Sequence, residues 1–148
     1  MISETMTKRI GEALKNRDEV RLSTFRLLSS AFNYEFIAKQ HKLSEEEELV
    51  VVRHEAKKRK EAIEAYQKAG APERAAKEQK ELEVLQEFLP AQISDEELGK
   101  IVEEATAQIG AKTIADIGKT MGVAMAKVAG RADGTRVLEI VKLKLTHD

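Results

Sequence analysis

Apolar residues recur three and four positions apart along almost the whole 148-residue chain, and no stretch alternates as a half-buried strand would. The clearest run carries three of the four phenylalanines and consists of Leu22, Phe25, Leu28, Ser29, Phe32 and Phe36. This spacing predicts one helix that turns these residues toward the core and ends near Lys39. The periodicity as a whole predicts an all-α protein.

Caps and breakers divide this pattern into seven predicted helices. Capping boxes, a serine followed three residues later by glutamate, occur at Ser44 and Ser94. The further residues that we expect to start or end helices are Ser3, Gly70, Pro72, Gly110, Thr113, Gly130 and Asp133. Pro90 prevents the fourth helix from continuing through Leu89. We therefore expect an N-terminal four-helix unit over residues 1–90 and a C-terminal three-helix bundle over residues 91–148.

The overall charge excludes a strong electrostatic pull toward a partner, because 25 basic residues face 26 acidic ones. No DNA or membrane partner is expected on this ground. The chain has no cysteine, so disulfides, thiol catalysis and cysteine metal sites are excluded. The sequence shows neither a signal peptide nor an apolar run of about twenty residues, and we expect a cytoplasmic location.

Two motifs resemble known catalytic or cofactor sites but fail in detail. Residues 118–120 read Gly-Lys-Thr, like the end of a phosphate-binding loop, yet Thr113 stands where that loop needs glycine. His54 begins a zinc-protease pattern, but Lys58 replaces its second histidine. We expect no catalytic residue, no metal and no cofactor, and no self-sufficient enzyme.

A charged pair is predicted within the N-terminal unit. Arg59 takes an apolar seam position between Ala56 and Ile63, and Glu78 takes the corresponding position on the next predicted helix. An unpaired buried charge would cost several kcal/mol, so we expect Arg59 and Glu78 to form an ion pair. A role in fixing helix register is favoured over ligand binding.

The C-terminal unit holds the candidate binding residues. Gly118, Gly122 and Ala126, spaced by four, form a flat helical face whose default role is close helix packing. Residues 112–144 contain seven basic residues against Asp116, Asp133 and Glu139. The candidates for contact with RNA or a partner are Gly118, Lys119, Gly122, Lys127, Arg131 and Arg136. On composition alone, ordinary solvated surface stays the favoured alternative.

Several phrases of the sequence are distinctive together. They are residues 23–28, 59–66, 78–85, 88–90, 116–122 and 130–134. With these phrases the chain resembles the GatB/YqeY family over nearly its whole length. Phe25 and Thr120 differ from the residues expected in the family's sequence pattern, but neither difference removes a chemical group that the interpretation requires.

The resemblance implies kinship with the tail of the B subunit of the glutamine-dependent Asp/Glu-tRNA amidotransferase, a tail that helps to hold tRNA. The parts that activate the carboxylate and release ammonia have no counterpart here. We therefore expect a non-catalytic tRNA-binding or tRNA-related module, with Lys119, Lys127, Arg131 and Arg136 facing phosphates. The alternatives are a helical protein-interaction adaptor and an auxiliary component of a carbon-nitrogen ligase that joins amidotransferase subunits.

Overall fold

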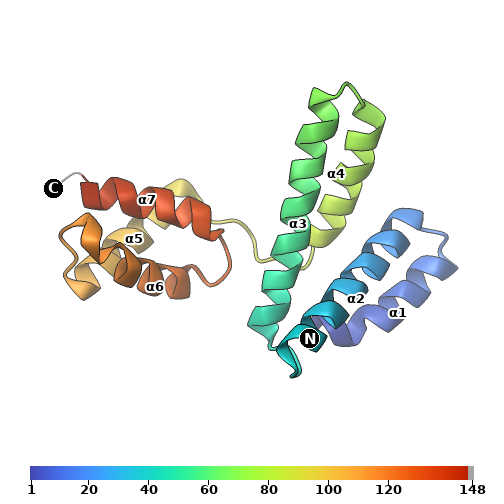
Figure 1. Ribbon diagram of the computed structural model, residues 1–148, viewed down its shortest axis with the longest axis horizontal. Helices are drawn as coiled ribbons and strands as arrows, with labels where there is room; N and C mark the ends of the chain where they lie inside the picture. The colour runs from blue at the N-terminus through green and yellow to red at the C-terminus, as the bar shows by residue number, and fades with distance from the viewer. Residues whose placement is uncertain (147–148) are drawn as a thin grey trace. The chain divides into compact units, whose positions relative to one another are not determined.

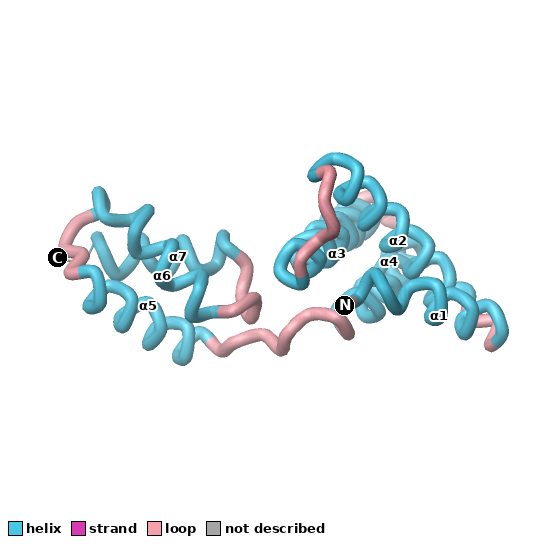
Figure 2. Tube along the Cα trace, turned by 90° about the horizontal axis from the view of Figure 1, so that it is seen from below, coloured by secondary structure: helices cyan, strands magenta, loops and turns pink. Residues whose placement is uncertain are grey.

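The computed structural model describes residues 1–146, and every regular element in that range is helical (Figure 1). The elements are α1 (Ile2–Lys15), α2 (Glu19–Lys39), α3 (Glu45–Lys68), α4 (Pro72–Gln86), α5 (Asp95–Ile109), the 3-10 turn η1 (Ile114–Asp116), α6 (Ile117–Val128) and α7 (Gly134–Thr146). Short loops join most of them, as Figure 2 shows. The predicted all-α fold, with four helices followed by three, is confirmed.

The chain divides into two compact units, here called the N-terminal unit (residues 1–89) and the C-terminal unit (from Pro90 on). In the N-terminal unit α1 packs on α2 and α3 packs on α4, while α2 also contacts α3 and α4. The core centres on Phe25 and Leu28 of α2, Val52 of α3 and Leu85 of α4. Over the described residues, no helix is both long enough and apolar enough to span a membrane.

The start of α3 confirms the first predicted capping box. The amide of Glu47 donates to Ser44 Oγ at 3.2 Å, and the Glu47 carboxylate accepts from the Ser44 amide at 2.8 Å. The second predicted box forms only by half: Ser94 accepts from the Glu97 amide, but the Glu97 carboxylate pairs with Arg131 instead. A reciprocal box was the wrong prediction there, because a distant cation outcompetes the local amide.

Two predictions in the N-terminal unit are wrong. Ser3 does not cap α1, because the helix begins at Ile2 and the Ser3 hydroxyl donates to Glu48 of α3. Phe36 does not reach the core and is half exposed. Helix α2 has its last buried residue at Phe32, so its final turns extend past the packed region.

The C-terminal unit is a three-helix bundle around Leu98, Val102, Val128, Val137 and Val141. Gly110 ends α5 in the left-handed conformation at φ 66°, as its position after Ile109 predicts. Asp133 accepts from the Arg136 amide at 2.9 Å and caps α7 as predicted.

The large apolar side chains in the first turns of α6 are not its most buried residues. Ile114 is half exposed in η1, and Ile117, Met121 and Met125 are only partly buried. The deepest positions are Thr120, Ala124 and Val128. Thr120 is buried because its hydroxyl donates to the Asp116 carbonyl at 3.0 Å, which satisfies its polar group locally.

Candidate functional site

The glycine face of α6 points to solvent. Gly118, Gly122 and Ala126 are exposed, on the side of the helix opposite Thr120 and Ala124. A Cβ built at either glycine would meet no atom within 4 Å. The expectation of close helix packing is therefore wrong for the described chain. Each glycine costs about 1 kcal/mol of helix stability relative to alanine, and nothing in residues 1–146 offsets it.

The borders of this glycine face differ in chemistry. Half-buried Met121 and Met125 lie along one border, and exposed Lys119 lies on the other. Within the described residues, no carboxylate oxygen lies within 4.0 Å of the Lys119 ammonium. Lys119 also lowers the pKa of Asp116, after the larger effect of hydrogen bonds from the amides of Lys112 and Thr113.

The other three candidate cations are each paired with a carboxylate of α5. Lys127 lies 3.5 Å from Glu104, Arg131 lies 3.2 Å from Glu97, and Arg136 lies 2.5 Å from Asp95. Lys127, in the last turn of α6, and Arg131, in the loop after it, thus meet one edge of α5. Arg136, on α7, meets the other edge. The four candidate cations therefore form no single cationic surface.

Arg131 also has a structural role. Its Nε donates to the Val128 carbonyl at 3.0 Å, and its Nη2 donates to the Lys127 carbonyl at 3.2 Å. These bonds satisfy carbonyl groups that the end of α6 leaves without helical partners. The Arg131 carbonyl accepts from the Ile93 amide at 3.0 Å. Arg131 thus holds the end of α6 against the segment before α5.

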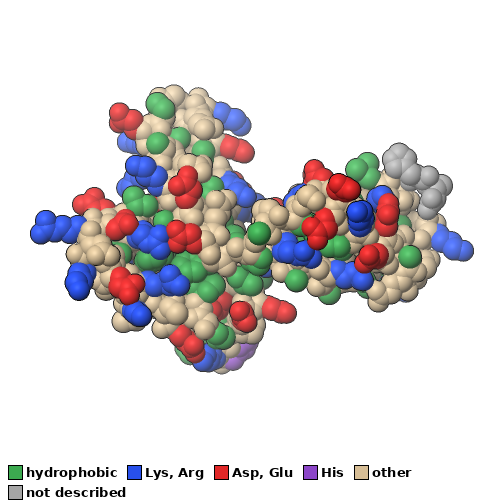
Figure 3. All heavy atoms as spheres, turned by 180° about the vertical axis from the view of Figure 1, so that it is seen from behind, with side chains coloured by type: hydrophobic (Ala, Val, Ile, Leu, Met, Phe, Trp, Pro, Cys, Tyr) green, Lys and Arg blue, Asp and Glu red, His purple; other side chains and the backbone are tan. Residues whose placement is uncertain are grey.

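Opposite charges alternate on the C-terminal unit. From residue 90 onward the sequence has eight basic and nine acidic residues. Figure 3 shows blue and red side chains interspersed over the face of this unit that it displays. The basic excess counted over residues 112–144 is offset in space by α5, which precedes that window in the sequence.

The charged seam of the N-terminal unit contains one more member than predicted. Arg59 Nε lies 3.5 Å from Glu78 Oε2 and 3.0 Å from Glu81 Oε2. Ser23 Oγ donates to Glu81 Oε1 at 3.2 Å, which ties α2 to the pair. Glu81 is the more buried carboxylate, with 6% of its side chain exposed against 19% for Glu78. Sequence reasoning missed Glu81, although its position one turn after Glu78 places it on the same helix face.

The sequence matches a known protein family over almost its whole length. A family model described as Yqey-like protein matches residues 3–145. The chain belongs to the YqeY family. No protein with a curated description matches the sequence. The YqeY match spans both units, so the N-terminal helices belong to the family pattern along with the glycine face of α6.

A second feature of this YqeY-family chain that sequence reasoning missed is the buried carboxylate of Glu48. Glu48 on α3 is fully buried and accepts from the amides of Ile2 and Ser3 at 2.7 and 3.3 Å, and from the Ser3 hydroxyl. These amides belong to the first turn of α1, where helical partners are missing. The only sequence signal was a fourth consecutive glutamate after Ser44, which reads as part of the cap.

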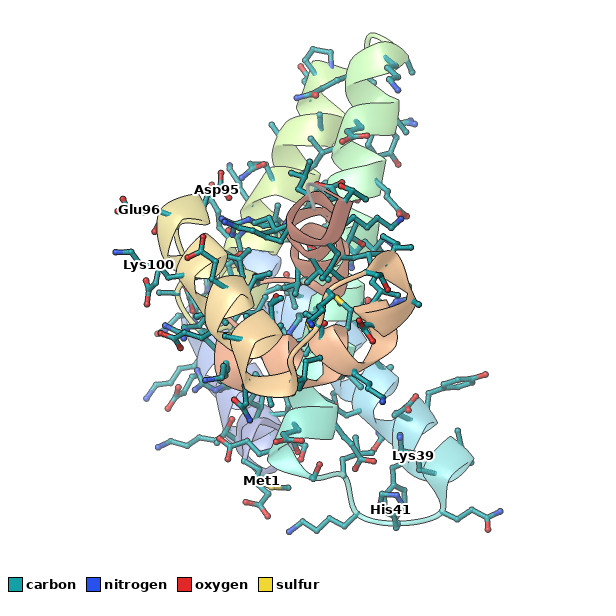
Figure 4. All side chains as sticks on the ribbon, turned by 90° about the vertical axis from the view of Figure 1, so that its left-hand side faces the viewer. Met1, Lys39, His41, Asp95, Glu96 and Lys100 are labelled. Atoms are coloured by element: carbon teal, nitrogen blue, oxygen red, sulfur yellow. The ribbon has the colours of Figure 1, made fainter. Side chains whose placement is uncertain are left out.

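Metal binding has no support in the described geometry. No three of the histidine and carboxylate side chains in residues 1–146 come together as metal ligands would. His54 is exposed on α3, and Lys58, at the second ligand position of the zinc-protease pattern, pairs with Glu55 at 2.9 Å. His41 lies in the loop between α2 and α3, with its Nε2 3.7 Å from Glu47, and is labelled in Figure 4.

Proposed function

We propose that this YqeY-family protein is a non-catalytic RNA-binding module that holds tRNA on the glycine face of α6. The observation that carries the proposal is the exposure of Gly118 and Gly122 beside Lys119. Two interior glycines that pack against nothing cost helix stability, and a partner that approaches the backbone closely would offset this cost. The resemblance to the amidotransferase tail supports tRNA as that partner, and the proposed location is the cytoplasm.

The geometry suits contact with an RNA backbone. With no Cβ at positions 118 and 122, a sugar-phosphate chain can lie along the helix without displacing a side chain. Lys119 supplies a charge for a phosphate on one border, and the border formed by Met121 and Met125 offers apolar surface to a ribose. Recognition of this kind reads shape and charge rather than bases.

A second candidate is docking of a helix from a protein partner on the same face, including a subunit of an amidotransferase. The observation that favours it is the half-buried methionine border, since methionine adapts to apolar partners. Helix docking depends on packing, whereas phosphate contact depends on charge. The two candidates therefore respond differently to salt and to the loss of Lys119.

The test is binding of deacylated tRNA to the full chain, measured by fluorescence anisotropy over a salt series. The proposal predicts binding that weakens steeply as salt rises. Lys119→Glu should weaken it further by about three- to tenfold at low salt, since it reverses one phosphate contact. The matched control is Lys57→Glu, because Lys57 is an exposed lysine of α3 in the other unit.

Gly122→Leu separates shape from charge. Leucine raises helix propensity, so a loss of binding would not reflect unfolding of α6. The proposal predicts that this variant binds tRNA much more weakly at every salt concentration. Absence of tRNA binding at low salt would overturn the proposal. An affinity that neither Lys119→Glu nor Gly122→Leu changes would show that the RNA binds at another surface.

A further inference from the structure

Among residues 90–146, four ion pairs join α5 to the segment that follows it, and α5 supplies the carboxylate in each. On one edge of α5 Glu97 meets Arg131 and Glu104 meets Lys127. On the other edge the pairs join Asp95 to Arg136 and Glu103 to Lys144. Every basic residue that these pairs involve belongs to the segment whose cations the sequence assigns to a binding surface.

In all four pairs the carboxylate is the outer partner. The four carboxylate side chains are 55–84% exposed, whereas their four cations are 29–38% exposed. Figure 4 shows Asp95 in the first turn of α5, next to Glu96. An approaching polyanion therefore meets negative charge before it reaches these cations.

Two of the masked cations come from the C-terminal end of α6 and the loop that follows it. The Arg131 guanidinium donates to the Lys127 carbonyl, and the charged groups of the two residues meet Glu97 and Glu104, seven residues apart on α5. The C-terminal end of α6 continues the helix that carries Gly118, Gly122 and Lys119. With the carboxylates neutralised, each of these cations would be free to contact a phosphate.

We infer that Glu97 and Glu104 act as internal competitors that mask Arg131 and Lys127 from phosphate and so limit the affinity of the α6 face. This inference rests on the proposed function in naming RNA as the natural polyanion, but the masking itself concerns any phosphate. Exposed ion pairs exchange at small cost, so phosphates can displace these carboxylates without unfolding the helices. A purely structural set of pairs would leave phosphate affinity unchanged when the carboxylates are neutralised.

The experiment compares the full wild-type chain with the double variant Glu97→Gln, Glu104→Gln. The matched control is Glu96→Gln, Glu139→Gln, which removes the same charge from two exposed carboxylates of the same unit that do not pair with Arg131 or Lys127. Affinity for deacylated tRNA is measured by anisotropy over a salt series. Inorganic pyrophosphate is titrated in parallel, with the Nε–H resonance of Arg131 as the reporter, and far-ultraviolet circular dichroism checks the fold.

The inference predicts that Glu97→Gln, Glu104→Gln binds both probes about three- to tenfold more tightly than the control pair. The slope of the logarithm of tRNA affinity against the logarithm of salt should also steepen by about one, because more cations contact phosphates directly. Equal affinities for the two double variants would overturn the inference, since only net charge would then matter.

The two probes separate the inference from the proposed function. If no protein binds tRNA but pyrophosphate binding improves only in Glu97→Gln, Glu104→Gln, the masking is upheld and the RNA function fails. If the wild type binds tRNA and this variant gains affinity for neither probe, the RNA function is upheld and the masking fails.

Discussion

Glu48 offers the sharpest test of how the N-terminal unit is held together. Its buried carboxylate accepts the amides of Ile2 and Ser3 and the Ser3 hydroxyl, so one side chain of α3 fixes the first turn of α1. Hydrogen bonds to a charged group contribute about 1.5–3 kcal/mol each. Water can replace part of this in Glu48→Ala, because Ile2 and Ser3 are only partly buried, and removing the buried charge also relieves its desolvation.

We therefore expect Glu48→Ala to lower the free energy of unfolding of the N-terminal unit by about 3 kcal/mol. In Glu48→Gln the amide oxygen can take the place of Oε2 and accept both amides, and the NH2 group can donate to the Ser3 hydroxyl, but the charge that strengthens these bonds is lost. Its loss of stability should therefore be about half as large, roughly 1.5 kcal/mol. The larger effect should come with fraying of α1, since its first turn would lose the side-chain acceptor that α3 supplies.

Urea unfolding followed by tyrosine fluorescence isolates this unit. The chain has two tyrosines and no tryptophan, and both Tyr34 and Tyr66 lie in the N-terminal unit. Glu64→Gln is the control, because Glu64 is an exposed glutamate of the same helix, and it should change the free energy of unfolding by no more than about 0.5 kcal/mol. A loss below about 1 kcal/mol for Glu48→Ala would refute the reasoning.

Three further predictions concern single positions. Ala129→Gly should stabilise the C-terminal unit by about 1 kcal/mol and raise its Tm by about 4–8 °C by circular dichroism, because Ala129 closes α6 in the left-handed region at φ 50°; an unchanged or lower Tm would count against it. Glu81→Gln should cost about 1–2 kcal/mol in urea unfolding, while Glu78→Gln should be nearly neutral, since the Arg59 guanidinium keeps its closer partner and one repulsion between carboxylates is lost; equal losses would contradict this. An NMR titration should give Asp116 a pKa below its usual value, because the amides of Lys112 and Thr113 donate to its carboxylate. The stability that this carboxylate contributes is then present above its unfolded-state pKa and is lost as pH falls through its lower folded-state pKa. An ordinary pKa would show that these hydrogen bonds do not form.

The helices could be predicted because their ends depend on neighbouring residues. Ser44 with Glu47, Gly110 after Ile109, and Asp133 before α7 are local signals, and the structure uses each of them. The core face of α2 could be read for the same reason, as far as Phe32.

The charge contacts were harder to predict because they join residues far apart in the chain. A window over residues 112–144 finds a basic excess, yet Glu97 and Glu104 of the preceding helix pair with its cations. In the sequence Glu48 looks like one more glutamate of the α3 cap, and only the packing of α1 shows that it accepts the Ile2 amide. As a polar residue, Thr120 suggests a surface position. It is buried in the structure because its hydroxyl donates to the Asp116 carbonyl, which leaves only its methyl group to pack in the core.

The glycine face illustrates a different limit. The spacing of Gly118 and Gly122 predicted a flat surface, and the structure has one. The sequence could not tell whether this surface packs inside the protein or faces solvent, because both cases require the same small residues. Only the packing of α5 and α7 on the opposite side of α6 decides this.

The central claim is that RNA lies along the glycine face of α6, and chemical-shift mapping of the ¹⁵N-labelled full chain with deacylated tRNA tests it most directly. The account predicts that the amide signals of Gly118, Lys119 and Gly122 shift or broaden first, and that signals of the N-terminal unit change least. Changes confined to residues 1–89, or an unperturbed α6 at saturating tRNA, would contradict it.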